Sequence, residues 1–219
     1  MNGVVSVLVN DASYRALAPA LAHLREDIPV YVCDTAEFSA ITGFNLHRGC
    51  LALAERPPEK DCAEVVRHAS CLLVLEEVTD ADNVGSAFRN AAAFGASVLL
   101  TNGCCDPLYR KAIRTSMGTV LRTPYARVHD WPQYLIALKG EGFTTVALTP
   151  REPAVDLSTL ARPQGRIALV VGSEGPGLSD AVESMADLRV RIRMRTDVDS
   201  LNLATATGIA LHQLATANR

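Results

Sequence analysis

Short apolar segments recur along the chain, and stretches with helical spacing separate them. The segments are rich in β-branched residues and leucine, and most contain almost no polar position. They comprise residues 4–9, 30–33, 50–54, 72–75, 98–101, 146–149, 167–171 and 190–194. Strands of this kind are typical of a sheet that helices cover on both faces.

The intervening stretches place apolar residues three and four positions apart, as an amphipathic helix does. We therefore expect helices at residues 13–24, 82–94, 107–116, 131–139, 180–185 and 203–217. Regular alternation of strands and helices predicts an α/β fold with a mostly parallel sheet.

A polar stretch at residues 55–68 interrupts the alternation, and it contains two consecutive prolines. Such a composition is typical of a linker. We predict a small α/β domain at residues 1–60 and a larger domain at residues 69–219, which has a common size for an independent domain.

Composition narrows the class of protein. Hydrophobic residues make up 48% and charged residues 21% of the chain, which is typical of a soluble globular protein. No apolar run approaches the roughly 18 residues of a membrane span, and no basic region precedes an apolar one at the N-terminus. We therefore expect a cytoplasmic protein with no membrane partner. The six cysteines form no C-x-x-C pair, so we expect no metal site.

The charge pattern leaves nucleic-acid binding open. The net charge is −3, whereas nucleic-acid-binding proteins are often basic overall. Basic residues nevertheless cluster in two places, one short run and one alternating series. The run is Arg110, Lys111 and Arg114, and the series is Arg189, Arg191, Arg193 and Arg195. Each group forms either a basic surface or an ordinary solvated face.

A first candidate segment, residues 82–95, follows the strand predicted at residues 72–75. Asp82 or Asn83 is positioned to cap the helix. Arg89 lies one turn beyond Gly85, and the missing side chain of Gly85 predicts open space beside the guanidinium where a ligand could bind. The alternative is a capped helix that carries an exposed arginine.

A second candidate segment is the glycine-rich sequence at residues 172–179, directly after another predicted strand. Such a turn lies at the carboxyl edge of a parallel sheet, where open α/β folds bind ligands. Its spacing matches neither a P-loop nor a dinucleotide fingerprint. Glu174 would repel a phosphate and suits a ligand with cationic or hydroxyl groups. The alternative is a plain strand-to-helix turn.

A third candidate segment, residues 192–211, carries the polar residues Asp199, Ser200 and Asn202 where the last helix should begin. Ser200 is a suitable N-cap, and the alanine, threonine and glycine residues that follow allow close packing. The alternative is a capped C-terminal helix without a functional role.

In their order and spacing, the three segments resemble the three motifs of the SpoU family, also called the TrmH family, of RNA ribose 2′-O-methyltransferases. The resemblance covers residues 72–214 and includes the sequence DPLYRKAIRTSMG at residues 106–118. The residues that match the family's motifs are Asn83, Arg89, Gly172, Glu174, Ser200 and Asn202. The chain departs from the pattern at Arg193, where the family usually has a small residue or proline before the methionine.

The resemblance implies a trefoil-knotted methyltransferase domain that binds S-adenosylmethionine without a metal and pairs into a homodimer. It implies cofactor contacts from Thr149, Gly172, Ser173, Glu174, Gly175, Ile192, Met194 and Leu201. The first domain is more faintly similar to a small RNA-binding domain found in many members, with residues 46–57 as the best-matching piece, and we expect it to be short at its start.

The implied activity is methyl transfer to a ribose 2′-hydroxyl of rRNA or tRNA. Arg89 is implied to activate the hydroxyl, but a guanidinium hardly ever deprotonates, so we expect it to hold RNA phosphate and stabilise the developing alkoxide. Asn83, Glu174, Ser200 and Asn202 would orient Arg89 and the ribose. Two alternatives remain: a catalytically silent RNA-binding module and a nucleotide-dependent oxidoreductase.

Overall fold

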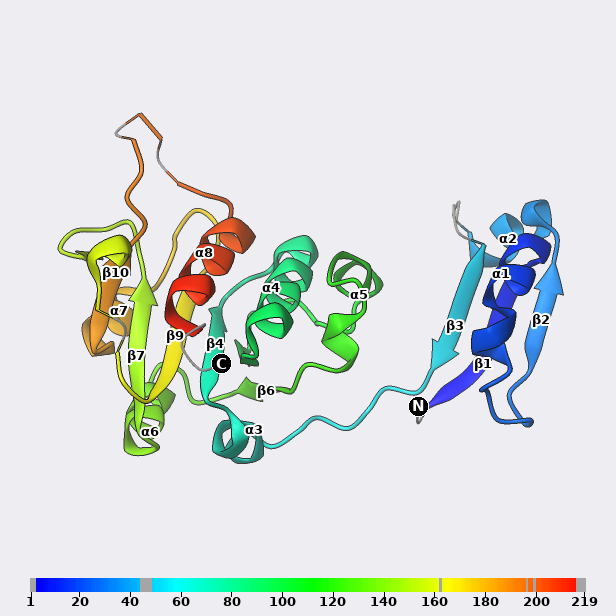
Figure 1. Cartoon of the computed structure of the whole chain (residues 1–219), viewed down its shortest axis with the longest axis horizontal. Coiled ribbons are helices and arrows are strands. Elements are labelled where there is room, and N and C mark those ends of the chain that lie inside the picture. Colours follow the sequence, from blue (N-terminus) through cyan, green and yellow to red (C-terminus); the bar gives the residue numbers. More distant parts are fainter. Residues whose placement is uncertain (1–2, 44–48, 162, 196, 199, 216–219) are drawn as a thin grey trace. The chain divides into compact units, whose positions relative to one another are not determined.

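A computed structural model describes residues 3–43, 49–161, 163–195, 197–198 and 200–215. The chain forms two compact units, Met1–Pro58 and Glu59–Arg219, and each has its own sheet (Figure 1). The division falls inside the polar stretch at residues 55–68. Parts of three predicted segments lie outside the described residues: residues 46–48, Asp199, and the end of the last helix at residues 216–217.

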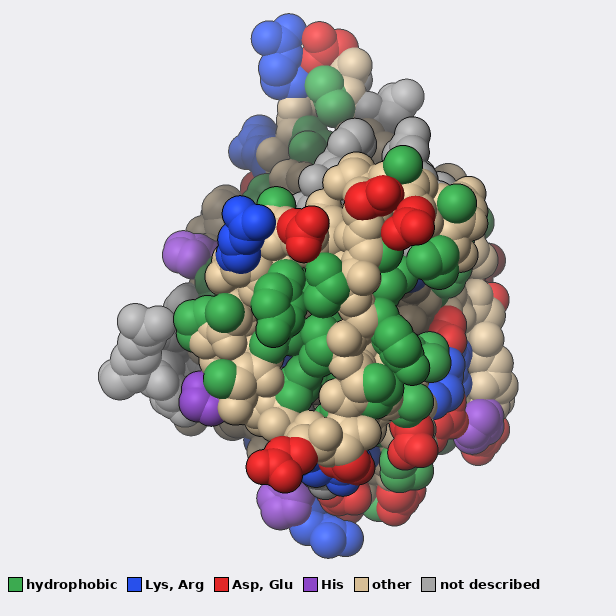
Figure 2. All heavy atoms as spheres, turned by 90° about the vertical axis from the view of Figure 1, so that its right-hand side faces the viewer, with side chains coloured by type: hydrophobic (Ala, Val, Ile, Leu, Met, Phe, Trp, Pro, Cys, Tyr) green, Lys and Arg blue, Asp and Glu red, His purple; other side chains and the backbone are tan. Residues whose placement is uncertain are grey.

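The first unit is a three-stranded sheet with two helices. Its strands β1 (Val4–Asn10), β2 (Val30–Cys33) and β3 (Cys50–Ala54) have the order β2-β1-β3, with β1 parallel to β2 and antiparallel to β3. Helix α1 (Asp11–Leu21) is close to the predicted one, and α2 (Thr35–Thr42) was not predicted. Much apolar surface stays exposed, as Figure 2 shows for one face of this unit, and exposed side chains include Tyr31 and Leu53.

The second unit contains, within the described residues, a seven-stranded sheet in the order β6-β5-β4-β9-β7-β10-β8. All of its neighbouring strands are parallel, which confirms the predicted sheet. The strands are β4 (Cys71–Glu76), β5 (Ser97–Thr101), β6 (Tyr125–Val128), β7 (Phe143–Leu148), β8 (Val155–Asp156), β9 (Arg166–Gly172) and β10 (Leu188–Arg191). Two edge strands, β6 and β8, were not predicted, and β10 ends three residues earlier than expected.

Helices cover both faces of this sheet. They are α3 (Cys62–His68), α4 (Ala81–Phe94), α5 (Arg110–Thr115), α6 (Tyr134–Gly140), α7 (Asp180–Met185) and α8 (Leu203–Ala215). Every residue of β4 is buried, and its alternate side chains enter two separate cores. Leu73 and Leu75 pack with α4 and α8, whereas Leu72 and Val74 pack with α3, α6 and α7. Helix α3 lies in the predicted linker, where Asp61 caps it.

The strand order places a ligand-binding edge at the centre of the sheet. From β4 the chain runs outward through β5 to β6 and then crosses to β7, and β9 later inserts between β4 and β7. Strands β4 and β9 are neighbours, but the chain continues from β4 toward β5 and from β9 toward β10, on opposite sides. Such a divergence of loops leaves a crevice at the carboxyl ends of the two strands.

Helix α4 packs closely against α5 (Figure 1), so the predicted open space beside Gly85 is wrong. A Cβ added at Gly85 would lie 2.6 Å from the carbonyl oxygen of Ala112 and 2.9 Å from the Cβ of Thr115. The glycine thus serves helix packing rather than ligand access.

The predicted cap of α4 also needs correction. Asp80, not Asp82 or Asn83, accepts from the first backbone N–H groups of the helix. Asp82 instead contacts α5, with Lys111 Nζ at 2.8 Å and Thr115 Oγ1 at 2.8 Å. The hydrogen bonds from Lys111 and Thr115 lower the pKa of Asp82 below its ordinary value.

No helix in the described part of the chain is at once long enough and apolar enough to cross a bilayer.

Substitution of Gly85 by alanine should lower the free energy of unfolding by about 1–3 kcal/mol, because the new methyl group would force α4 and α5 apart. Urea denaturation measures this change. Gly140→Ala is the matched control: a Cβ there meets no atom within 4 Å, so its effect should be neutral or slightly stabilising. Equal effects of the two substitutions would contradict the packing role of Gly85.

Candidate functional site

A cavity of about 530 Å³ lies at the carboxyl edge of the second sheet. Four parts of the chain form its wall: the end of β7 with the residues after it, the glycine-rich turn after β9, the segment that joins β10 to α8, and the start of α8. Its volume lies in the range of sites for small organic ligands.

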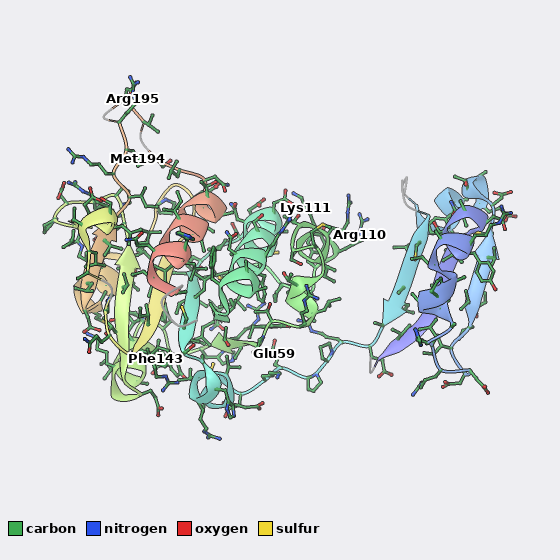
Figure 3. All side chains as sticks on the ribbon, viewed as in Figure 1. Glu59, Arg110, Lys111, Phe143, Met194 and Arg195 are labelled. Carbon is green, nitrogen blue, oxygen red and sulfur yellow. The ribbon has the colours of Figure 1, made fainter. Side chains whose placement is uncertain are left out.

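All eight residues that the resemblance implies for cofactor binding line this cavity. They are Thr149, Gly172, Ser173, Glu174, Gly175, Ile192, Met194 and Leu201. Met194 lies on the segment that rises from β10 (Figure 3). Sequence reasoning missed other lining residues, among them Leu148 and Val171 at strand ends and Leu203 and Ala206 on α8. The strand-end residues were readable as part of the sheet edge, whereas nothing in the spacing indicated that α8 contributes.

The glycine-rich turn folds back on itself. Ser173 and Gly177 form an antiparallel bridge, and the amide of Gly177 donates to the carbonyl of Ser173 at 3.1 Å. A Cβ at Gly172 would lie 2.3 Å from the carbonyl carbon of Gly177, and Gly175 has a φ of 90°. This reversal therefore requires glycine, and it presents Glu174 at the cavity.

Polar contacts behind the cavity hold the segment after β7 in place. Thr149 Oγ1 donates to the buried carboxyl group of Glu183 at 2.6 Å, and Arg189 reaches the other oxygen of Glu183 at 2.7 Å. Arg151 donates to the carbonyl of Pro176 and to Asp180, each at 2.8 Å. These contacts join two walls of the cavity, and no motif in the sequence indicated a role for Glu183 or Arg151.

Several residues of the two basic groups pair with acids. Arg189 pairs with Glu183, Arg191 with Glu152 and Arg195 with Asp197, so acidic neighbours offset part of the positive charge of the alternating series. Arg110 and Lys111 extend from α5 (Figure 3), and Lys111 pairs with Asp82.

The side-chain amide of Asn202 joins two of the other predicted catalytic residues. Its Nδ2 lies 3.0 Å from Asn83 Oδ1 and 3.0 Å from Glu174 Oε1, so both amide hydrogens have an acceptor. Asn83 is buried in the first turn of α4, whereas Glu174 and Asn202 are exposed at the cavity. The structure thus brings together one residue from each candidate segment.

Asn202 also begins α8, which corrects the predicted cap at Ser200. Its Oδ1 accepts from the backbone N–H of Ala204 at 3.0 Å and of Thr205 at 3.4 Å. Ser200 lines the cavity with an exposed side chain.

Arg89 does not join this cluster within one chain. It is exposed, and no hydrogen bond or ion pair involves it in the part of the chain that the structure describes. It lies six residues after Asn83, which is about 9 Å further along the helix axis and on another side of α4. Within one chain the described residues show no hydrogen bond from Asn83, Glu174 or Asn202 to Arg89, and their role in orienting it stays a prediction.

Among the described residues that line the cavity, Glu174 is the one with an acidic or basic side chain. A carboxylate at this place favours a ligand with a positive charge. The described residues contain no group of His, Cys, Asp and Glu side chains arranged to hold a metal ion.

Comparisons with known proteins agree with this geometry. A family model described as the SpoU rRNA Methylase family matches residues 70–212. An uncharacterized tRNA/rRNA methyltransferase of Mycobacterium tuberculosis is 46% identical over 201 residues, which cover 88% of this chain and 70% of the relative. The 23S rRNA (guanosine(2553)-2′-O)-methyltransferase RlmP of Bacillus subtilis is 30% identical over 195 residues, covering 87% and 74% of the two chains.

Solved structures show the same fold. A putative RNA methyltransferase of the TrmH family from Porphyromonas gingivalis has a TM-score of 0.78 at 25% identity and covers 96% of this chain and 81% of its own. An AdoMet-bound rRNA methyltransferase from Sinorhizobium meliloti has a TM-score of 0.79 at 24% identity, covering 96% and 78%, and supports the fold alone.

Two substitutions of Asn202 distinguish its role as the cap of α8 from its hydrogen bonds to Asn83 and Glu174. Asn202→Ala should lower the free energy of unfolding by about 1 kcal/mol, because α8 loses its cap. Asn202→Ser keeps a capping oxygen and should stay within about 0.5 kcal/mol of wild type. Urea denaturation of both variants checks this; equal losses would mean that the bridge, not the cap, stabilises the fold.

Proposed function

Because this chain belongs to the SpoU rRNA methylase family, we propose that it transfers a methyl group from S-adenosylmethionine to a ribose 2′-hydroxyl of a structured RNA, either rRNA or tRNA. One observation carries the proposal: the Asn202 amide joins Asn83 and Glu174 at the cavity. The name of the Bacillus subtilis relative supports the 2′-hydroxyl as the acceptor.

The residues of the cavity fit S-adenosylmethionine. Apolar side chains such as Leu148, Ile192 and Leu201 suit the adenine ring, and the backbone of the turned segments offers polar groups to the ribose and amino acid portions. Glu174 supplies negative charge for a ligand that carries a cationic sulfur. When bound, the cofactor supplies an electrophilic methyl group on that sulfur.

Transfer of that methyl group to the ribose oxygen would break its bond to sulfur, and a group of the chain would have to take up the hydroxyl proton. We assign proton acceptance to Glu174, because it is the one titratable side chain among the described residues that line the cavity, and Asn202 donates a hydrogen bond to its Oε1. A positioned proton acceptor typically contributes about 10²–10⁴-fold. Ser200 and Asn83 would help to orient the ribose.

Arg89 retains the electrostatic role, since a guanidinium holds phosphate well and deprotonates poorly. It shares the exposed side of α4 with Ala92 and Ala93, next to α8, which carries the exposed Ile209. Asn90 Nδ2 binds the carbonyl of Ala204 at 2.6 Å and holds the two helices together. We infer a homodimer through this surface, in which Arg89 serves RNA bound at the partner's cluster.

We further propose that the domain is knotted. Strand β10 lies two strands from β9, yet α8, the next element along the chain, packs against α4 and β9, so the chain returns across the sheet between β10 and α8. Passage of this connection through the loop that precedes it would close a trefoil knot. The first unit would bind RNA, with the exposed rings of Tyr14 and Tyr31 available for stacking on unpaired bases.

A transfer assay tests the function directly. With labelled S-adenosylmethionine, chelator and the cellular rRNA and tRNA pool, the enzyme should place label on ribose 2′-oxygens, detected as 2′-O-methylnucleosides by mass spectrometry. RNA bearing a 2′-deoxy nucleotide at the modified site is the control and should accept no methyl group. Binding of RNA without transfer would leave a silent RNA-binding module, and no calorimetric heat at millimolar cofactor would contradict the cofactor assignment.

Arg89→Ala should leave affinity for S-adenosylmethionine nearly unchanged and cut transfer by about 10²–10³-fold. Arg89→Lys should fail almost as badly if two directed hydrogen bonds are needed, because lysine lacks the planar fork. Near wild-type turnover of Arg89→Ala would contradict the electrostatic role assigned to Arg89.

Mixed dimers test whether Arg89 acts at the site of its own chain or at the site of the partner. Neither Arg89→Ala nor Asn202→Ala should transfer alone, whereas mixing the two, with dimers checked by light scattering, should restore part of the activity if Arg89 serves the partner's site. Failure of mixing to restore activity would place Arg89 in its own chain's site.

A further inference from the structure

A buried carboxyl group outside the proposed catalytic set accepts three hydrogen bonds next to the cavity. It belongs to Glu76, the last residue of β4, which is 4% exposed. Ser179 donates to it twice, from its backbone N–H at 2.9 Å and from its Oγ at 2.7 Å. Trp131 Nε1 donates at 2.9 Å.

Both ends of the glycine-rich turn are attached to Glu76. At the upstream end, Gly172 is the β-ladder partner of Glu76. At the downstream end, Ser179 is held by the Glu76 side chain. Between these two anchors, Gly175 and Gly177 both have positive φ, and a Cβ at either would meet no atom within 4 Å. At these two glycines the turn has no side-chain packing, so its conformation depends on polar contacts: the bridge between Ser173 and Gly177, the hydrogen bond of Asn202 to Glu174, and the two anchors on Glu76.

The same contacts extend to a second wall of the cavity. Ser179 Oγ also accepts from the amide of Val182 and so caps α7. Helix α7 carries Glu183, whose carboxyl group holds Thr149. Glu76 thereby fixes the start of the helix that supports the segment after β7.

We infer that Glu76 is a positioning residue for the proposed methyl transfer, acting through Ser179 on the glycine-rich turn and on α7. The inference rests on the proposed function for its catalytic consequence, but the anchoring itself is independent of any ligand. A buried carboxylate is costly unless it is well hydrogen-bonded, and no cation pairs with Glu76 among the described residues. Its three donors provide that compensation and make its geometry specific.

The chain offers a built-in reporter, because Trp131 is its single tryptophan. Glu76→Gln keeps the size of the side chain and replaces one acceptor oxygen by a donor. We expect a shifted Trp131 emission spectrum and faster hydrogen exchange in the peptide that spans residues 172–182. Affinity for S-adenosylmethionine, measured by calorimetry, should fall about tenfold, the effect of losing one hydrogen bond to a charged group.

Glu77→Gln is the matched control. Glu77 is the next residue along the chain, but its carboxyl group contacts Thr101 rather than the turn. Its substitution should leave emission, exchange at residues 172–182 and cofactor affinity at wild-type values. Ser179→Ala removes the Oγ donor to Glu76 together with the cap of α7 and keeps the backbone N–H. It should shift Trp131 emission and raise exchange at residues 172–178, outside α7, and these two measurements decide the matter if Glu76→Gln does not fold.

Unchanged exchange of residues 172–182 in folded Glu76→Gln would overturn the inference whether or not a ligand binds. Unchanged cofactor affinity despite faster exchange would overturn its catalytic part. Wild-type protein that binds no S-adenosylmethionine would overturn the proposed function instead, and the exchange measurement would still judge the anchoring.

Discussion

The side-chain amide of Asn202 satisfies four polar groups at once, and the arrangement of the site depends on it. Its oxygen accepts from two backbone N–H groups at the start of α8, and its nitrogen donates to Asn83 and to Glu174. Three segments that are far apart in the sequence therefore meet at one planar group. Because an amide has a fixed geometry, the start of α8 and the positions of Asn83 and Glu174 cannot vary independently.

Two buried carboxyl groups that do not line the cavity, those of Glu76 and Glu183, hold the segments that form its wall. Glu76 holds the end of the glycine-rich turn, and Glu183 holds Thr149. Both are buried, so each interaction is shielded from water and is stronger than it would be at the surface. A turn that glycine makes adaptable is thus given one conformation by side chains from neighbouring strands and helices.

Much of this fold was readable from local patterns, and the failures have physical reasons. The strand at Cys71–Glu76 was clear because it is apolar throughout, whereas Val155–Asp156 is too short to give a pattern. Helix α4 was expected, but Asp80, Asp82 and Asn83 are all residue types that cap helices, and composition does not distinguish them; in the structure Asp80 is the cap and Asp82 contacts α5. Gly85 was misread because its neighbour, Ala112, lies on another helix.

In the candidate site, too, some features were predicted from the sequence and others arise only from tertiary contacts. The family resemblance supplied the residues that line the cavity, but spacing could not reveal that Asn202 bonds to Asn83, which is 119 positions away. The supporting residues Glu76 and Glu183 lie outside the motifs, and their role exists only through tertiary contacts.

The double use of Asn202 has a consequence for turnover. The segment that joins β10 to α8 forms one wall of the cavity, and it ends at the residue that caps α8 and bridges the cluster. Any displacement of Asn202 would therefore end its contacts with Asn83 and Glu174 and remove the cap of α8 together. If release of the spent donor requires such a displacement, it also takes the cluster apart. Donor exchange and an assembled reaction centre would then exclude each other, so that a chain open to solvent is also a chain unable to react.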